Sequence, residues 1–310
     1  MNNNTIDDFL ENFVEIEKKL KKSKIIIFMG GFGEERDASL YSGKAVSNEL
    51  LQKGWNIEII DPSINTTWLQ EVDSKCLAFN CLHGIFGESG HLPSILDYLK
   101  IKYTFSDSYA SIIAFDKLFF KSIVHKLNLK VPIDNYDDPF KTSNSDFFIH
   151  KKIRGGGSID LIMDTNQNNT NNSHFTEEFI PGKILTMGVL ESNHDYIPLS
   201  IVEIVMKGSK FYDQKAKYEE GFCEYKLYDG DNIRKISKEV VKICKFLNIK
   251  GGARFDFIES KNKDEVYFLE INNVPGLYSS SNFIFSASGL KLSFYQVLVW
   301  LLNNAKYNKL

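Results

Sequence analysis

Residues 252–276, GARFDFIESKNKDEVYFLEINNVPG, decide the fold of the C-terminal half of the chain. Polar residues interrupt the apolar runs 252–258 and 265–271, and both runs have the length and composition of β-strands. The polar stretch 260–264 between them is a short turn, so we predict an antiparallel hairpin.

Four polar side chains lie on this predicted hairpin. Residues two apart on a strand share a face, so Arg254 points with Asp256 and Glu270 points with Asn272. A turn centred near Asn262 places Arg254 opposite Glu270, with all four side chains on one face. Two carboxylates and an amide oxygen suit Mg²⁺ held together with substrate phosphates. We interpret the face as a metal site rather than a surface salt-bridge patch, because the polar residues interrupt otherwise apolar strands.

The segment from Asn273 to Gly276 follows the second strand directly. Its Pro-Gly pair predicts a sharp turn whose backbone amides can face the metal site. An N–H group of this turn beside Arg254 would form an oxyanion hole.

The N-terminal third alternates strand-like and helix-like runs, which predicts a doubly wound parallel sheet. The predicted elements are strands 24–28, 56–61 and 77–81 and helices 37–53 and 92–99. Ligands of such sheets bind beyond the carboxyl ends of the strands. The polar clusters 30–39 and 83–90 lie at such ends, so we expect them to line a substrate site.

Helical spacing of apolar residues predicts an amphipathic leading helix over 5–22, capped by Thr5, and a single helix over 108–127. We interpret the leading helix as a packing or oligomerisation element. The rest is predicted to be an α+β half with strands 147–152, 184–190 and 198–206 and helices 231–247 and 291–304. We expect three domains, 1–106, 107–180 and 181–310.

The composition is that of a soluble globular enzyme. The 310 residues are 43% hydrophobic and 25% charged, which suits two or three domains, and the net charge of −3 argues against nucleic-acid or membrane-surface binding. The four cysteines form no CxxC pair, which excludes the usual zinc spacings. We find neither a secretory leader nor an apolar run of about 18 residues, so we expect a cytoplasmic protein.

These patterns resemble the D-alanine–D-alanine ligase family of the ATP-grasp superfamily. Residues 270–276, Glu-Ile-Asn-Asn-Val-Pro-Gly, are similar to the family's Glu-x-Asn-Thr-x-Pro-Gly, and 252–256 are similar to its Arg-x-Asp strand. Further similar motifs follow in the family order at 30–39, 83–90, 115–117 and 211–218.

The resemblance implies a doubly wound N-terminal domain followed by a two-lobed ATP-grasp fold. It implies a carbon–nitrogen ligase that joins two D-alanine molecules for peptidoglycan synthesis, with ATP converted to ADP and phosphate through an acylphosphate. It further implies two Mg²⁺ ions, replaceable by Mn²⁺, at Asp256, Glu270 and Asn272. It implies that the protein binds D-alanine and ATP and forms a homodimer. It implies no nucleic-acid or membrane partner.

The resemblance also assigns the substrate residues. Glu35 would hold the ammonium of the first D-alanine, and His83 would help to close that end of the site. Ser281 would bind the carboxylate of the second D-alanine. Arg254 and the Gly276 N–H would stabilise the tetrahedral oxyanion.

On the nucleotide side, the resemblance implies that three lysines surround the phosphates and that a glycine-rich loop and a linker hold the rest of ATP. The implied residues are Lys117, Lys151 and Lys217, Ser158 of the loop, and Glu177, Glu178, Phe179 and Ile180 of the linker. Two positions depart from the family pattern. Gly157 replaces a serine that the family bonds to the Tyr218 position, and Ile184 replaces the glutamate that grips the ribose, so we expect weaker ATP binding.

Three alternatives stay open. A sister enzyme would join D-alanine to D-lactate or D-serine, although Tyr218 favours the dipeptide. A degenerate, non-catalytic binding protein with the same fold would explain the departures from the family pattern at Gly157 and Ile184. It would not explain why all three predicted metal ligands are present. The hypothesis of an NAD-binding protein has the least support, because residues 31–36 lack the third glycine of the GxGxxG motif.

Overall fold

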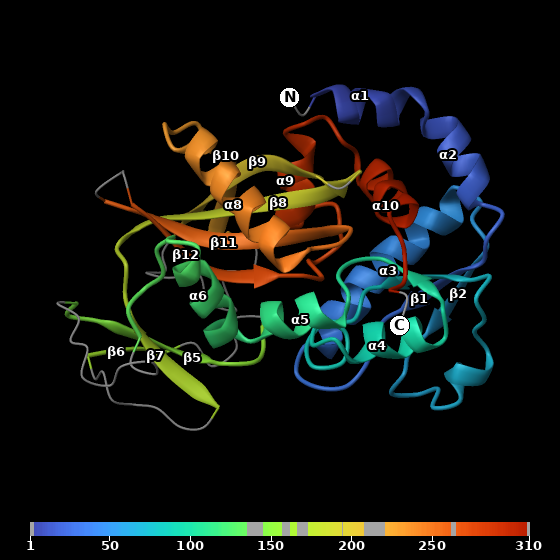
Figure 1. The fold of residues 1–310 in the computed structure, drawn as a ribbon, viewed down its shortest axis with the longest axis horizontal. Helices are drawn as coiled ribbons and strands as arrows, with labels where there is room; N and C mark the ends of the chain where they lie inside the picture. Colours follow the sequence, from blue (N-terminus) through green and yellow to red (C-terminus); the bar gives the residue numbers. More distant parts are fainter. Residues whose placement is uncertain are drawn as a thin grey trace.

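The computed structural model describes residues 3–308 except 135–144, 157–161, 166–172, 194, 208–220 and 262–264. The described strands form a four-stranded, a five-stranded and a three-stranded sheet. Figure 1 shows the four-stranded sheet at one end of the molecule and the other two at the opposite end. The predicted class, a parallel-sheet unit followed by antiparallel lobes, is confirmed. We propose the division into 1–106, 107–180 and 181–310 as domains, because each part contributes one sheet.

The N-terminal sheet is parallel, with strand order β2-β1-β3-β4. Its elements are β1 (Ile25–Phe28), α3 (Arg36–Gln52), β2 (Ile57–Ile60), the 3-10 helix η1 (Trp68–Gln70), β3 (Leu77–Asn80), α4 (His91–Tyr98) and β4 (Lys102–Tyr103). All four side chains of the central strand β1 are buried, as expected for a strand covered on both faces. The clusters 30–39 and 83–90 follow the adjacent strands β1 and β3, so both lie at the same edge of the sheet.

The five-stranded sheet is antiparallel, with strand order β10-β9-β8-β11-β12. Its elements are β8 (Gly182–Ser192), β9 (Asp195–Met206), β10 (Cys223–Leu227), α8 (Ile233–Leu247), β11 (Gly252–Ser260) and β12 (Val266–Asn272). Helix α8 buries Ile236, Val240 and Ile243 at helical spacing, in one core cluster with Phe255 and Phe257 of β11. The side chains that alternate with these phenylalanines therefore point to the other face of the sheet.

The register of the hairpin differs from the prediction. Arg254 lies opposite Asn272 and Asp256 lies opposite Glu270, so the predicted pairing of Arg254 with Glu270 is wrong. The observed register is displaced by two residues. The pairs next to the turn, such as Glu259 with Val266, are already displaced by one, and a bulge between Asp256 and Phe257 adds the second. A displacement of two residues keeps the parity, so the four polar side chains still share a face.

The three-stranded sheet consists of β5 (Phe148–Lys152), β6 (Ile162–Asp164) and β7 (His174–Glu178). The chain reaches it through α5 (Ser108–Phe115) and α6 (Lys117–Lys126), so the single helix predicted over 108–127 is wrong. Asp116 is extended, with φ −91° and ψ 107°, and its carboxylate accepts hydrogen bonds from the backbone N–H groups of Leu118 and Phe119. An aspartate in this conformation caps a new helix, which explains the break.

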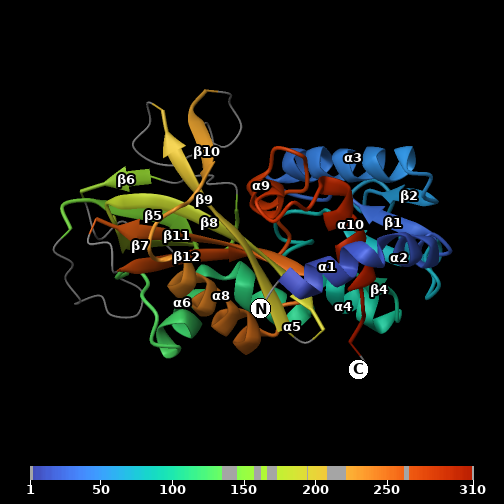
Figure 2. The ribbon, with the colours of Figure 1, turned by 90° about the horizontal axis from the view of Figure 1, so that it is seen from above.

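The leading segment also forms two helices, α1 (Asn3–Glu11) and α2 (Phe13–Leu20), so the continuous helix with a Thr5 cap is wrong. The break falls at Asn12, where no side chain caps α2. Both helices pack against α10 (Phe294–Asn303), as Figures 1 and 2 show, and the rings of Phe9 and Trp300 lie 4.6 Å apart. Among the described residues, we find no helix with the length and apolar character of a membrane span.

Candidate active site

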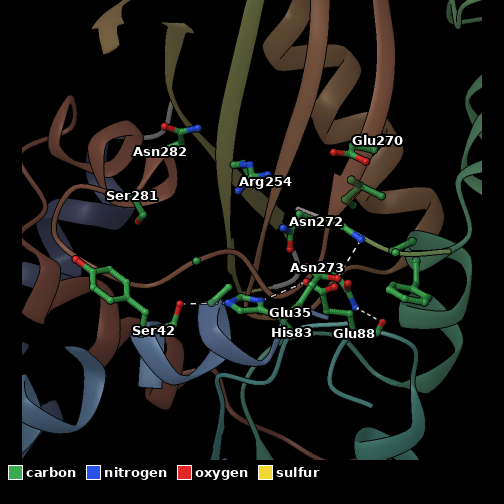
Figure 3. Close-up of a pocket in the computed structure, with 18 of the residues that line it drawn as sticks. Glu35, Ser42, His83, Glu88, Arg254, Glu270, Asn272, Asn273, Ser281 and Asn282 are labelled. Carbon is green, nitrogen blue, oxygen red and sulfur yellow. Dashed lines mark hydrogen bonds and ion pairs between the residues drawn. The ribbon is translucent and has the colours of Figure 1, made fainter. Parts of the chain in front are cut away.

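One pocket lies between the N-terminal sheet, Gly155 and Gly156 at the start of the glycine-rich loop, and the five-stranded sheet. It measures about 970 Å³ with its open mouth counted. It brings together eight residues predicted for the site: Glu35, His83, Lys117, Arg254, Glu270, Asn272, Gly276 and Ser281. Figure 3 shows Arg254 and Glu270 approaching from the strands and His83 and Glu35 from the opposite side. Residues from both ends of the sequence therefore face a common space.

Arg254 and Asp256 form a bidentate pair on β11. The guanidinium Nε donates to Asp256 Oδ1 at 3.0 Å and Nη2 donates to Oδ2 at 2.8 Å. The Thr186 hydroxyl of β8 also donates to Oδ1, at 2.6 Å. Asp256 is not among the residues that line the pocket, but its carboxylate holds the lining residue Arg254 in a fixed orientation.

Lys117 connects the strands to the glycine-rich loop. Its Nζ lies 3.3 Å from Glu270 Oε2 and donates to the carbonyl of Gly155 at 2.5 Å. Glu270 and Asp256 are register partners, and Asn272 follows on the same face of β12. These carboxylate and amide oxygens, beside a lysine and an arginine, fit the ligand chemistry of Mg²⁺ bound to phosphates.

Glu35 lies at the N-terminal end of α3 and accepts a hydrogen bond from the Gly156 N–H at 3.0 Å. Burial, together with the charge of Glu88, raises the pKa of its carboxyl to about 7, although His83, the Gly156 N–H and Lys117 act in the opposite direction. The carboxyl therefore changes charge in the physiological pH range.

His83 follows β3 and lies between two side chains. Its Nε2 is 3.2 Å from the Ser42 hydroxyl of α3, and its Nδ1 is 3.4 Å from Glu88 Oε1. Burial lowers the pKa of His83, but the Glu88 hydrogen bond and the carboxylates of Glu88 and Glu35 outweigh burial and raise it overall. The other oxygen of Glu88 accepts from the Gly84 N–H at 3.0 Å, which fixes the carboxylate.

Lys117 is the one predicted nucleotide residue that lines this pocket; the other described ones lie on or directly after β5 and β7, outside its lining. Lys151 pairs with buried Glu177, whose other oxygen is 2.8 Å from Lys121 Nζ. Lys121 also lies 2.7 Å from Asp134, so two lysines neutralise two carboxylates. The three linker residues after Glu177 adjoin it: the Glu178 carboxylate accepts from the Ile133 N–H, the Phe179 N–H donates to the Phe147 carbonyl, and Ile180 is buried.

Three predicted residues, Ser158, Lys217 and Tyr218, lie outside the described residues, as does Gly157. Ile184 lies on β8, where it pairs with Ile204 and Ile258 in an apolar row of the sheet.

Ala38 and Glu88 line the pocket and belong to the clusters 30–39 and 83–90 that were expected there. Further lining residues had no predicted role: Tyr41, Ser42, Ala114, Phe115, Gly155, Gly156, Tyr225, Ile271, Asn273, Tyr278 and Asn282. The helical periodicity of α3 could have indicated Ser42, which lies two turns after Glu35 and hence on the same face. The contact of Glu35 with Gly156 follows only from the tertiary fold, because a long stretch of sequence separates them.

The fold that carries this pocket is the fold of the ATP-grasp ligases. The structure superposes on a D-alanine–D-alanine ligase from Bacillus anthracis complexed with ATP with a TM-score of 0.75 at 21% identity, covering 91% of this chain and 96% of that one. It superposes on the VanG D-Ala:D-Ser ligase from Enterococcus faecalis with a TM-score of 0.72 at 23% identity, covering 90% and 98%. At these identities the likeness establishes the fold alone.

Comparisons of the sequence identify the family within this class of ligases. Residues 161–303 match the family model described as D-ala D-ala ligase C-terminus. The chain is 31% identical over 287 residues to a D-alanine–D-alanine ligase of Rickettsia massiliae, covering 86% of this chain and 87% of the relative. It is 32% identical over 282 residues to that of Aquifex aeolicus, covering 82% and 91%. The chain belongs to the D-alanine–D-alanine ligase family.

Proposed function

We propose that the protein joins two D-alanine molecules into D-alanyl-D-alanine for the peptidoglycan precursor, with ATP converted to ADP and phosphate. One observation carries the proposal: Glu35 and His83 share a single pocket with Arg254, Glu270 and Asn272. A carboxylate able to hold an ammonium thus faces groups able to hold phosphates, and such proximity is what a ligation reaction requires.

The first step transfers the γ-phosphoryl group of ATP to the carboxylate of the first D-alanine. Glu35 would hold the ammonium of that substrate, so that its carboxylate points toward the strands. Asp256, Glu270 and Asn272 would hold two Mg²⁺ ions, replaceable by Mn²⁺, which neutralise the phosphate charge when bound. Lys117, already beside Glu270, would add positive charge next to the transferred group.

In the second step, the amine of the second D-alanine attacks the acyl carbon, and the bond from that carbon to the phosphate oxygen breaks. Ser281, at the start of α9 (Asn282–Ser288), would bind the carboxylate of this substrate, while His83 closes the opposite end. Arg254 and the Gly276 N–H would stabilise the oxyanion, at roughly 3–4 kcal/mol per donor.

ATP would bind against β5 and β7. Lys151 would leave Glu177 for a phosphate, and the buried Glu177 carboxylate would keep its ion pair with Lys121, which limits the cost of the exchange. The remaining proposed ATP contacts are Ser158 and Lys217 and the linker residues Glu177, Glu178, Phe179 and Ile180. Tyr218 stays a predicted member of the active-site hydrogen-bond network.

Glu35 makes the binding of the first D-alanine depend on pH. Only the ionised carboxylate holds an ammonium, and the carboxyl pKa of about 7 means that lower pH protonates it. We therefore expect the KM of the first D-alanine to fall about tenfold from pH 6 to pH 8, as the ionised fraction rises. Initial rates over this range at saturating ATP measure the effect.

Glu35→Gln should bind D-alanine more weakly and lose the pH dependence. Glu34→Gln is the matched control, because Glu34 is adjacent in sequence but its side chain is 62% exposed and pairs with Lys152. The control should keep the wild-type profile. An unchanged profile in Glu35→Gln would contradict the proposed ammonium contact.

The function is tested by incubating the protein with ATP, Mg²⁺ and D-alanine. Phosphate release and dipeptide by mass spectrometry should rise together. D-lactate and D-serine offered in competition should yield less product than a second D-alanine. A protein that binds ATP in calorimetry without forming any ligation product would instead be the non-catalytic relative.

The need for ATP and D-alanine leads us to propose a cytoplasmic enzyme that acts without nucleic acid or membrane. We also propose a homodimer. Light scattering coupled to size-exclusion chromatography measures the mass of the assembly and would contradict this proposal if it returned the mass of a single chain.

A further inference from the structure

Ser42 lies where three parts of the pocket meet. It is on α3, two turns after Glu35, and only 1% of it is exposed. Figure 3 shows its side chain directed at His83, with Glu88 on the far side of the ring. The contacts are 3.2 Å from Ser42 Oγ to His83 Nε2 and 3.4 Å from His83 Nδ1 to Glu88 Oε1.

The hydroxyl of Ser42 has a second partner. The backbone N–H of Leu277, directly after the Pro275–Gly276 turn, donates to Ser42 Oγ at 3.3 Å. A hydroxyl has one proton and two lone pairs, and Leu277 occupies one of the lone pairs. Ser42 therefore joins the histidine to the turn whose Gly276 N–H is proposed to stabilise the oxyanion.

The contacts determine the tautomer of neutral His83. The Glu88 carboxylate can only accept, so Nδ1 must carry the proton. Nε2 then has a lone pair, and the proton of Ser42 points to it. When His83 gains a second proton, Nε2–H donates instead, and Ser42 fills its second lone pair and frees its own proton.

We propose that Ser42 is a positioning residue of the ligase reaction: it fixes the Nδ1–H tautomer and ring orientation of His83 and couples them to the turn that carries Gly276. This role rests on the proposed function. The charges of Glu88, Glu35 and Arg254 all act on the His83 ring. The orientation of the ring therefore affects the electrostatic interactions of these three groups at the D-alanine end of the pocket.

Kinetics of Ser42→Ala test the role in the reaction. Loss of the hydroxyl leaves the buried Nε2 and the Leu277 N–H without their partner, and we expect kcat/KM for D-alanine to fall about 5- to 100-fold. The KM for ATP should stay unchanged, because the proposed ATP contacts Lys151 and Glu177 lie on β5 and β7 and not in this hydrogen-bond network. Ser42→Thr, which keeps the hydroxyl, should recover most of the loss.

Ser47→Ala is the matched control. Ser47 is on the same helix and similarly buried, with 3% exposed, but among the described residues its hydroxyl donates only to the carbonyl of Lys44. This variant should keep wild-type kcat/KM. Ser42→Ala within twofold of Ser47→Ala, in a protein that forms dipeptide, would overturn the positioning role.

The tautomer can be measured without turnover. Long-range ¹H–¹⁵N spectra of histidine-labelled protein, recorded through a pH titration, distinguish a protonated from an unprotonated ring nitrogen. The chain has six histidines, and His83→Gln assigns the relevant signal. We expect neutral His83 to be protonated at Nδ1; protonation at Nε2 would overturn the inference. A wild-type protein that forms no dipeptide would refute the proposed function, while these spectra would still decide the tautomer.

Discussion

Glu270→Gln should lower the rate of dipeptide formation about a thousandfold or more. The substitution replaces a charged oxygen ligand by a neutral amide at the centre of the face formed by Arg254, Asp256 and Asn272. A bound metal contributes several kcal/mol of charge stabilisation to the transition state, and each 1.36 kcal/mol corresponds to about a factor of ten. Lys117 would also lose its anionic partner, so the phosphates would meet a distorted site.

Steady-state kinetics over a range of Mg²⁺ concentrations, with dipeptide as the readout, measure this effect. Glu265→Gln is the control, because Glu265 lies just before the same strand and pairs with Lys130 at the surface. It should leave the rate unchanged. A Glu270→Gln protein that keeps its melting temperature and more than a tenth of the activity would refute the metal assignment.

Arg254→Met should lower kcat about 100- to 1,000-fold, the usual loss when one donor to an oxyanion is removed. Methionine preserves the length of the side chain but removes the charge and both hydrogen bonds to Asp256. Arg254→Lys should recover little of the rate, because an ammonium cannot reproduce the planar bidentate contact.

Single-turnover measurements separate the two chemical steps in this variant. The oxyanion forms only when the amine attacks, so dipeptide formation should slow more than phosphoryl transfer. Arg234→Met is the control, since Arg234 lies on the exposed part of α8. Equal losses in both steps would instead place Arg254 with the phosphates.

The hairpin shows what the sequence could and could not predict. Alternation with a period of two placed Arg254 with Asp256 on one strand and Glu270 with Asn272 on the other, and this depends only on the parity of the residue numbers. The register between the strands, which brings the two pairs to one face, depends on a bulge next to Asp256, for which the chain has no glycine or proline marker. The pairs within each strand were therefore predictable, whereas the partners across the hairpin were not.

Helix boundaries failed for a related reason. Continuous apolar spacing through 108–127 predicted one helix, but Asp116 ends α5 and caps α6. Asp116 also pairs with Arg154, which lies far away in the sequence. The spacing of apolar residues predicts which face of a helix is buried. It does not predict a break in the helix that a residue far away in the sequence stabilises.

The site residues also divide into those that a local motif predicts and those that depend on contacts between separate elements. Glu35 and Lys117 were predictable from local motifs, and the structure places both in the pocket. The pairing of Lys151 with Glu177 and the contact of Ser42 with His83 connect separate elements. No single motif contains both members of either pair, so only the folded chain could show them.

The packing of α1 and α2 on α10 also has a consequence for biosynthesis. The Glu17 carboxylate accepts a hydrogen bond from the Tyr295 hydroxyl, 278 positions further along the chain. A ribosome that adds roughly 5–20 residues per second needs tens of seconds to reach that tyrosine. Until then the apolar faces that include Phe9 and Phe13 lack α10, against which they pack. Helices α1 and α2 therefore reach their final place only after α10 has been made.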